Sequence, residues 1–197
     1  MKKIDFYFDF ASPNAYLSHQ ALKKYTNQSD IEINYIPVLL GGIFKLTNNQ
    51  PPMMAFAEVK GKLEYENLEM QRFIDFHNLT KFKMNPNFPV ITLMLMRGAI
   101  AAEEEGFLAD YIEKMSIEMW EKEKKLDDPE VLKTAYDEAG FDSEKLFNLM
   151  GTQDIKDKLL SNSSLAAERG VFGIPTFFVN DEMYFGKNTL LEIFKDS

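Results

Sequence analysis

The chain has 197 residues, no cysteine and a formal net charge of -9 at pH 7. This length allows one substantial hydrophobic core but not two independent ones. The acidic balance excludes a basic nucleic-acid surface, and the lack of cysteine excludes disulfides, thiolate metal sites and dithiol exchange within the chain.

The first 40 residues predict a β-α-β unit. Residues 4–10 are apolar nearly throughout, as in a strand that is covered on both faces, and residues 13–25 carry apolar side chains at helical spacing. A turn at residues 27–30 leads to a second strand at 31–36, which we expect to be parallel to the first. Asp5 and Asp9 interrupt the apolar run, so it does not resemble a signal peptide, and we expect a cytoplasmic protein.

From residue 41 the pattern becomes helical. A polar loop at residues 46–52 precedes helices predicted at 54–78, 89–105, 107–125, 129–139 and 143–150. Asp128 followed by Pro129 is a typical helix start. The most apolar stretch, residues 88–96, is far too short to cross a membrane, and no membrane partner is expected.

The end of the chain returns to a mixed pattern. It predicts a helix at 154–169, strands at 175–179 and 183–185, and a last helix at 188–195. Strands from both ends of the chain would then share one sheet. The fold class is therefore α/β, with a helical insertion in the middle of the chain.

Two short motifs indicate a binding site. Ser12 and Pro13 follow the first strand directly, and about 160 residues later Ile174 and Pro175 open another strand. A helix N-terminus leaves N–H groups unpaired and favours anions, and a proline at the start of a strand leaves part of a backbone edge free. Together these motifs are suited to a thiolate and an extended peptide. Since the chain has no cysteine, the thiolate would arrive with a ligand.

Six fragments of the chain match one family pattern. They are DFASPNAYL at 9–17, LGGIFK at 40–45 with NQPP at 49–52, the spaced set Lys62, Tyr65, Glu69 and Arg72, NFP at 87–89, GVFGIPTF at 170–177, and FG at 185–186. On these fragments the chain resembles the kappa-class glutathione transferases and the 2-hydroxychromene-2-carboxylate isomerases, relatives of the DsbA-type oxidoreductases. The resemblance implies a thioredoxin-like domain from residues 1–40 and 165–197, with an inserted all-helical domain at 41–164.

The resemblance also implies glutathione as the cofactor, and it assigns roles to individual residues. Ser12 would be catalytic, its hydroxyl donating to the glutathione sulfur, although a serine before a proline is also a good N-cap in any α/β protein. A cis peptide bond is expected before Pro175. The cofactor-binding residues would be Asn49, Lys62, Ile174, Pro175 and Asn188, and the substrate-binding residues would be Tyr65 and Lys62.

Several of these residues also have ordinary interpretations. Asn49 lies among polar turn residues, and Lys62 is of a type that is usually solvated. Glu69 and Arg72 are spaced for an ion pair within one helix, which we favour over a catalytic role. Trp120 is expected in the core or at a dimer surface. The two histidines lack neighbours at ligand spacing, so no metal site is proposed.

One departure from the family pattern affects the cofactor. Where the family has G-x-D-R-L, this chain has Gly186-Lys187-Asn188-Thr189-Leu190. The family aspartate binds the γ-glutamyl amino group of glutathione, whereas Asn188 carries no charge to pair with an ammonium.

Three functions remain open from the sequence. The resemblance favours a glutathione-dependent isomerase that acts on a small aromatic 2-hydroxy-carboxylate. The alternatives are a kappa-class-like transferase or peroxidase, and a non-enzymatic binding module with a thioredoxin fold, which the altered Asn188-Thr189 pair supports. A homodimer is expected from the resemblance.

Overall fold

A single four-stranded sheet joins the two ends of the chain. The structure is a computed structural model that describes residues 2–26 and 31–195, so the turn predicted at 27–30 lies outside the described residues. The strands are β1 (Lys2–Phe8), β2 (Ile31–Pro37), β3 (Thr176–Val179) and β4 (Glu182–Phe185), in the order β2-β1-β3-β4. As predicted, β1 and β2 are parallel, with α1 (Pro13–Thr26) between them. Strand β3 is antiparallel to β1, and β4 is antiparallel to β3.

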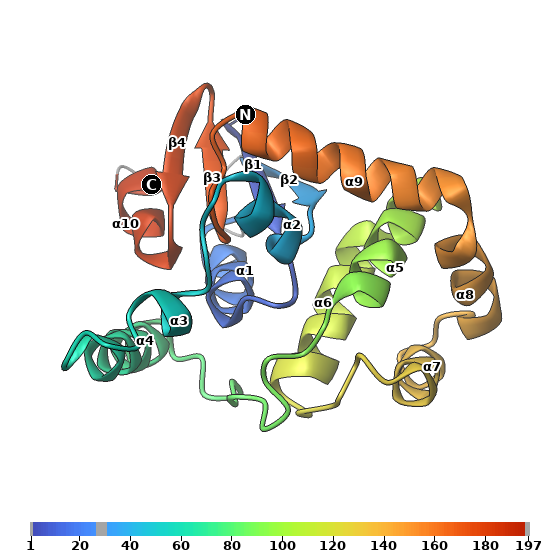
Figure 1. The fold of residues 1–197 in the computed structure, drawn as a ribbon, viewed down its shortest axis with the longest axis horizontal. Coiled ribbons are helices and arrows are strands. Elements are labelled where there is room, and N and C mark those ends of the chain that lie inside the picture. Colours follow the sequence, from blue (N-terminus) through green and yellow to red (C-terminus); the bar gives the residue numbers. More distant parts are fainter. Residues whose placement is uncertain (1, 27–30, 196–197) are drawn as a thin grey trace.

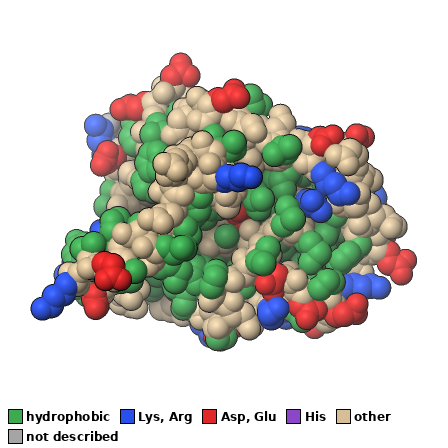
Figure 2. All heavy atoms as spheres, in the orientation of Figure 1, with side chains coloured by type: hydrophobic (Ala, Val, Ile, Leu, Met, Phe, Trp, Pro, Cys, Tyr) green, Lys and Arg blue, Asp and Glu red, His purple; other side chains and the backbone are tan. Residues whose placement is uncertain are grey.

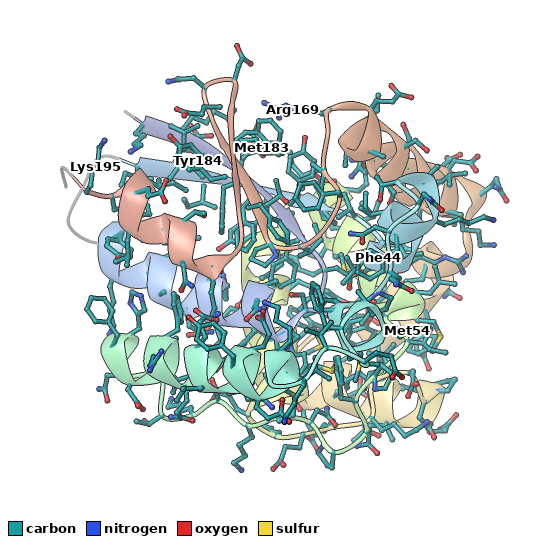
Figure 3. All side chains as sticks on the ribbon, turned by 60° about the vertical axis from the view of Figure 1, so that its left-hand side comes forward. Phe44, Met54, Arg169, Met183, Tyr184 and Lys195 are labelled. Carbon is teal, nitrogen blue, oxygen red and sulfur yellow. The ribbon has the colours of Figure 1, made fainter. Side chains whose placement is uncertain are left out.

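The two faces of the sheet are covered differently. Ile4, Phe6 and Phe8 are fully buried on the face that contacts α1, where the Phe8 ring lies edge-on to His19. The other face carries Asp5, Tyr7 and Phe178. Helix α9 (Gln153–Glu168) leads to this face, and Arg169 at its end, labelled in Figure 3, lies over the Phe178 ring and bonds to Asp5 and Tyr7. Burial on both faces explains why the first strand is apolar along nearly its whole length.

Apart from α2, which packs on α9, the helices between β2 and α9 form two groups in Figure 1. Helices α5 to α8 lie on the right, and α3 and α4 lie at the lower left, near α1. Their bounds are α2 (Leu40–Leu46), α3 (Pro52–Ala55), α4 (Lys62–His77), α5 (Leu93–Glu104), α6 (Leu108–Trp120), α7 (Pro129–Glu138) and α8 (Ser143–Gly151). The chain ends in a 3-10 turn, η1 (Lys187–Thr189), and in α10 (Leu190–Ile193).

Three local predictions were wrong in detail. Helix α2 was not predicted, because two adjacent glycines disfavour a helix; it forms because Ile43 is fully buried and α2 packs on α9. The helix expected at 54–78 is two helices: α3 ends at Ala55, and Gly61 adopts a left-handed conformation (φ +79°) directly before α4 begins. The last predicted helix is split into η1 and α10.

One continuous hydrophobic core runs through the sheet and the helical insertion. Trp120 is fully buried in it, and its indole N–H donates to the carbonyl of Phe10, 3.2 Å away. Trp120 is therefore a core residue, one of the two alternatives that the sequence left open. The division into 1–40 with 165–197 and 41–164 stays a prediction. Among the described residues, no helix is long and apolar enough to cross a membrane.

Candidate functional site

Ser12 lies at the N-terminus of α1, directly against the segment that precedes β3. Its Oγ accepts a hydrogen bond from the N–H of Ala15 at 3.2 Å and donates to the carbonyl of Ile174 at 3.0 Å. The side chain therefore caps α1, as the ordinary interpretation requires, and it also contacts the second motif. Only 5% of Ser12 is exposed, so a ligand could contact only a small part of its side chain.

The segment around Ile174 and Pro175 presents a backbone edge beside Ser12. The peptide bond between these two residues is cis, which confirms the expectation drawn from the family resemblance. The carbonyl of Pro175 accepts from the N–H of Gly186 at 2.9 Å. Within the part of the chain that the structure describes, the N–H of Ile174 donates to no protein acceptor. An extended peptide can pair with such a group as an added strand would.

Asp9 connects the Ser12 loop to the helical insertion. It is fully buried, and its carboxylate accepts from the N–H of Ala11 (2.9 Å), the N–H of Leu40 (2.6 Å) and the hydroxyl of Thr92 (2.7 Å). Burial raises the pKa of Asp9 above its ordinary value, and the hydrogen bonds oppose that shift. The sequence predicted no site role for Asp9, which belongs to a family motif and interrupts an apolar run. A carboxylate directly after a mostly apolar strand and just before Ser12 was the available signal.

Asn49 reaches the same region from the loop between α2 and α3. Its amide donates to the carbonyl of Phe172 at 2.8 Å, and its oxygen accepts from the N–H of Gln50. Phe172 lies two residues before Ile174. Its ring packs against Phe185 with 4.5 Å between the centroids, and both rings are partly exposed, at 37% and 45%. Asn49 thus holds the α2–α3 loop against an apolar surface beside the site.

Asn188 is held by a carboxylate from α4. Glu69 accepts hydrogen bonds from the ammonium of Lys187 and from the side-chain amide of Asn188. The expected pair between Glu69 and Arg72 was therefore wrong, because the fold brings η1 against α4 and supplies a nearer cation. Burial acts to raise the pKa of Glu69, but the bonds from Lys187 and Asn188 hold it below its ordinary value.

Lys62 and Tyr65 lie at the start of α4, apart from Ser12. The ammonium of Lys62 pairs with Glu66 and lies 5.0 Å from the centre of the Phe56 ring, and Tyr65 is 53% exposed. Among the described residues, neither side chain bonds to Ser12 or Ile174. The structure therefore brings together Ser12, Ile174 and Pro175, with Asn49 and Asn188 attached through neighbouring residues, and it leaves Lys62 and Tyr65 on a separate helix.

Apolar side chains are exposed near the site, and the face drawn in Figure 2 is hollowed. Figure 2 shows a recess near the centre of this face, bordered largely by hydrophobic side chains. In Figure 3, Phe44 of α2 and Met54 of α3 lie on the same side of the molecule, away from Tyr184 and Lys195. Two surface cavities lie elsewhere. One of about 560 Å³ follows α4 beside Met70, Ile74 and Phe82, and one of about 360 Å³ lies between β3, β4 and α10.

Metal ligands do not gather at this site. Within residues 2–26 and 31–195, no three His, Asp or Glu side chains are grouped so that they could hold a metal ion.

The chain matches one protein family over nearly its whole length. The family described as the DSBA-like thioredoxin domain matches residues 3–195. The 2-hydroxychromene-2-carboxylate isomerase of Pseudomonas putida is 26% identical over 188 residues, which cover 95% of this chain and 90% of the relative. Glutathione S-transferase kappa 1 of Rattus norvegicus is 25% identical over 178 residues, which cover 88% of this chain and 79% of the relative.

A solved structure agrees with these relatives. The structure of a 2-hydroxychromene-2-carboxylate isomerase superposes with a TM-score of 0.84 at 24% identity, and the match covers 98% of this chain and 93% of that one. At this identity the likeness shows the fold: a DsbA-like thioredoxin fold with a mixed sheet and many helices, as the sequence predicted.

Proposed function

Because this chain belongs to the DsbA-like thioredoxin family, we propose that it is a glutathione-dependent isomerase of the 2-hydroxychromene-2-carboxylate isomerase type. The observation that carries the proposal is the contact between the Ser12 hydroxyl and the Ile174 carbonyl at the N-terminus of α1. A chain without cysteine cannot supply a thiolate there itself. A hydroxyl at a helix N-terminus can stabilise a sulfur that a ligand supplies.

The residues around Ser12 suit glutathione. Among the described residues the N–H of Ile174 has no protein acceptor, so it can pair with a peptide backbone. Asn49 bonds to the carbonyl of Phe172, two residues before Ile174, and Asn188 lies two residues after Gly186, whose N–H bonds to Pro175. We therefore assign Ile174, Pro175, Asn49 and Asn188 to cofactor binding. When bound, glutathione would supply the nucleophilic sulfur for a reversible addition that lets a double bond rotate.

The protein's own part in the reaction is to keep that sulfur ionised. The Ser12 hydroxyl would turn from the Ile174 carbonyl toward the sulfur, and hydrogen bonding to the charged form lowers a pKa. The partial positive charge at the start of α1 acts in the same direction. The remaining task is to hold the substrate ring in line with the sulfur.

Side chains of the helical insertion would hold the substrate. The apolar recess of Figure 2 suits an aromatic ring. We assign the substrate carboxylate to Lys62 and a ring contact to Tyr65, both on α4; Lys62 also serves as a candidate contact to a glutathione carboxylate. Lys62 would have to exchange its pairing with Glu66 for a carboxylate of the ligand. A small aromatic carboxylate is accordingly the proposed substrate class.

The test replaces Ser12 and compares it with a second serine on the same helix. Ser12→Ala should lower the isomerase rate about tenfold and raise the pKa of the bound thiol, which thiolate absorbance reports. Ser18→Ala is the control, because Ser18 is also buried on α1 and its Oγ has no hydrogen-bond partner among the described residues. A thiol pKa that Ser12→Ala leaves unchanged would contradict the role of Ser12.

The similarity to kappa-class transferases gives a second candidate. Glutathione S-transferase kappa 1 is about as similar in sequence as the isomerase, so a transferase or peroxidase outcome deserves its own assay. An isomerase turns over with a catalytic amount of glutathione, whereas a transferase consumes it. If calorimetry detects no glutathione binding up to millimolar concentrations, the non-enzymatic binding module is the remaining function. The homodimer and the cytoplasmic location stay predictions.

A further inference from the structure

We propose that Asp9 is a positioning residue that fixes the Ser12 loop to the first turns of α2 and α5. Its carboxylate accepts one hydrogen bond from each of three separate segments: Ala11 in the loop, Leu40 at the start of α2, and Thr92 at the start of α5. The most distant of these donors, Thr92, lies 83 positions from Asp9 in the chain. A single buried group therefore sets how the sulfur-binding loop sits relative to the helical insertion.

Neither α2 nor α5 is capped by the side chain of its own N-cap residue, and both helix starts bond to Asp9. Thr92 is the N-cap of α5, and threonine is a good capping residue, yet its side chain caps no N–H of α5 and donates to Asp9 instead. The N-cap of α2 is Leu39, which has no side-chain acceptor, and the carboxylate of Asp9 accepts from the next N–H, that of Leu40. At two helices the N-cap residue makes no side-chain capping hydrogen bond, and a bond to the Asp9 carboxylate forms instead. Departures from local preference of this kind are expected at functional positions.

The carboxylate is costly to bury, which argues against a role in packing alone. Asp9 is fully buried, and its contacts are with two backbone N–H groups and one hydroxyl rather than with a cation. A buried carboxylate is tolerated where several donors satisfy it. An apolar residue of similar size would fill the space without this cost, but it could not connect three segments.

The segments that Asp9 holds together are connected directly to residues of the proposed site. Helix α2 continues into the loop that carries Asn49, which bonds to the segment before Ile174. Phe10, the residue after Asp9, is held through its carbonyl by Trp120 at the end of α6. A shift of the Asp9 carboxylate would therefore move the cofactor-binding loop and the Ser12 loop relative to each other.

The experiment uses native-state hydrogen exchange on the intact, ligand-free protein. Thr92→Val removes the hydroxyl and keeps the shape, whereas Thr92→Ser keeps the hydroxyl. We expect Thr92→Val to speed exchange at the N–H groups of Ala11 and Leu40 about tenfold, the factor that 1.4 kcal/mol corresponds to. Thr92→Ser should restore protection close to the wild-type level.

A matched control breaks a different buried hydrogen bond at the same helix start. The Oγ of Ser163 accepts from the N–H of Leu39 at 2.9 Å, so Ser163→Ala also weakens the start of α2. It should speed exchange at Leu39 and leave Ala11 protected. If Ser163→Ala exposes Ala11 as much as Thr92→Val does, or if Thr92→Val leaves Ala11 protected, Asp9 does not position the loop.

A second measurement rests on the proposed function. Thr92→Val should weaken glutathione binding about fivefold to tenfold in calorimetry, while Ser163→Ala binds within twofold of wild type. A wild-type protein that binds no glutathione overturns the proposed function and leaves the exchange result to decide the role of Asp9. A wild type that binds, together with Thr92→Val that binds equally well, overturns the positioning of the cofactor site.

Discussion

Gly98 is the glycine at which an added methyl group would meet its neighbours most closely. It lies within α5, and two buried tyrosine hydroxyls fill the space where its side chain would be. A Cβ added there would lie 2.2 Å from the Oη of Tyr111 and 2.5 Å from the Oη of Tyr136. These hydroxyls bond to each other at 2.7 Å, and the Tyr111 hydroxyl also bonds to the carbonyl of Leu95.

The net effect of Gly98→Ala is the sum of opposing contributions. Overpacking a rigid core costs about 1–3 kcal/mol, and separating a buried hydrogen-bonded pair costs about 1–3 kcal/mol more. Replacing glycine by alanine within a helix contributes about 0.5–1 kcal/mol in the opposite direction. We therefore expect Gly98→Ala to lower the free energy of unfolding by roughly 1–5 kcal/mol, which is a fall in Tm of roughly 2–20 °C for a chain of this length.

The assay is urea denaturation of Gly98→Ala beside a matched glycine. Gly41→Ala is the control, because Gly41 lies in α2 and a Cβ there meets nothing within 4 Å. Helix propensity alone should then leave Gly41→Ala equal to wild type or more stable by up to about 1 kcal/mol. The same substitution is thus expected to act in opposite directions in two helices.

A double mutant tests whether the hydroxyl contact is the cause. Tyr111→Phe removes the oxygen that would lie closest to the new methyl group. Gly98→Ala with Tyr111→Phe should therefore be less destabilised than the sum of the two single variants, with a coupling of about 1 kcal/mol or more. Strict additivity, or a Gly98→Ala variant as stable as Gly41→Ala, would refute the packing argument.

Three further predictions concern pH and the aromatic surface. Because bonds from Lys187 and Asn188 hold the pKa of Glu69 below its ordinary value of 4.5, Glu69→Gln should lower stability at neutral pH, and the difference should shrink as the pH falls below about 4.5; urea midpoints at several pH values will show this. Burial lowers the pKa values of His19 and His77 from 6.5, so the unfolded chain binds more protons, stability should fall as the pH drops below about 6.5, and His19→Gln should reduce that slope in the same titration. Gly173→Ala would place a Cβ 2.9 Å from the Phe185 ring. It should therefore reduce the free energy of glutathione binding, measured by calorimetry, by more than it reduces the free energy of unfolding.

Much of the fold follows from local sequence patterns. The apolar first strand, the Asp128-Pro129 helix start and the β-α-β unit depend on side-chain periodicity and capping, which act over a few residues, and the structure has each of them. The family motifs added the cis bond before Pro175 and the thioredoxin-like arrangement. Ser12 was proposed from the sequence because a strand that runs into a helix N-terminus is itself a local signal, and its catalytic role stays a prediction.

Only the tertiary structure decided which distant groups meet. Spacing within one helix paired Glu69 with Arg72, but the fold places Lys187, 118 positions away, against the same carboxylate. Helix α2 forms in spite of its glycines because Asp9 and α9 supply partners from elsewhere in the chain. Local preferences contribute tenths of a kcal/mol, whereas a buried carboxylate must have its hydrogen bonds, and the partners that satisfy it are known only once the chain is folded.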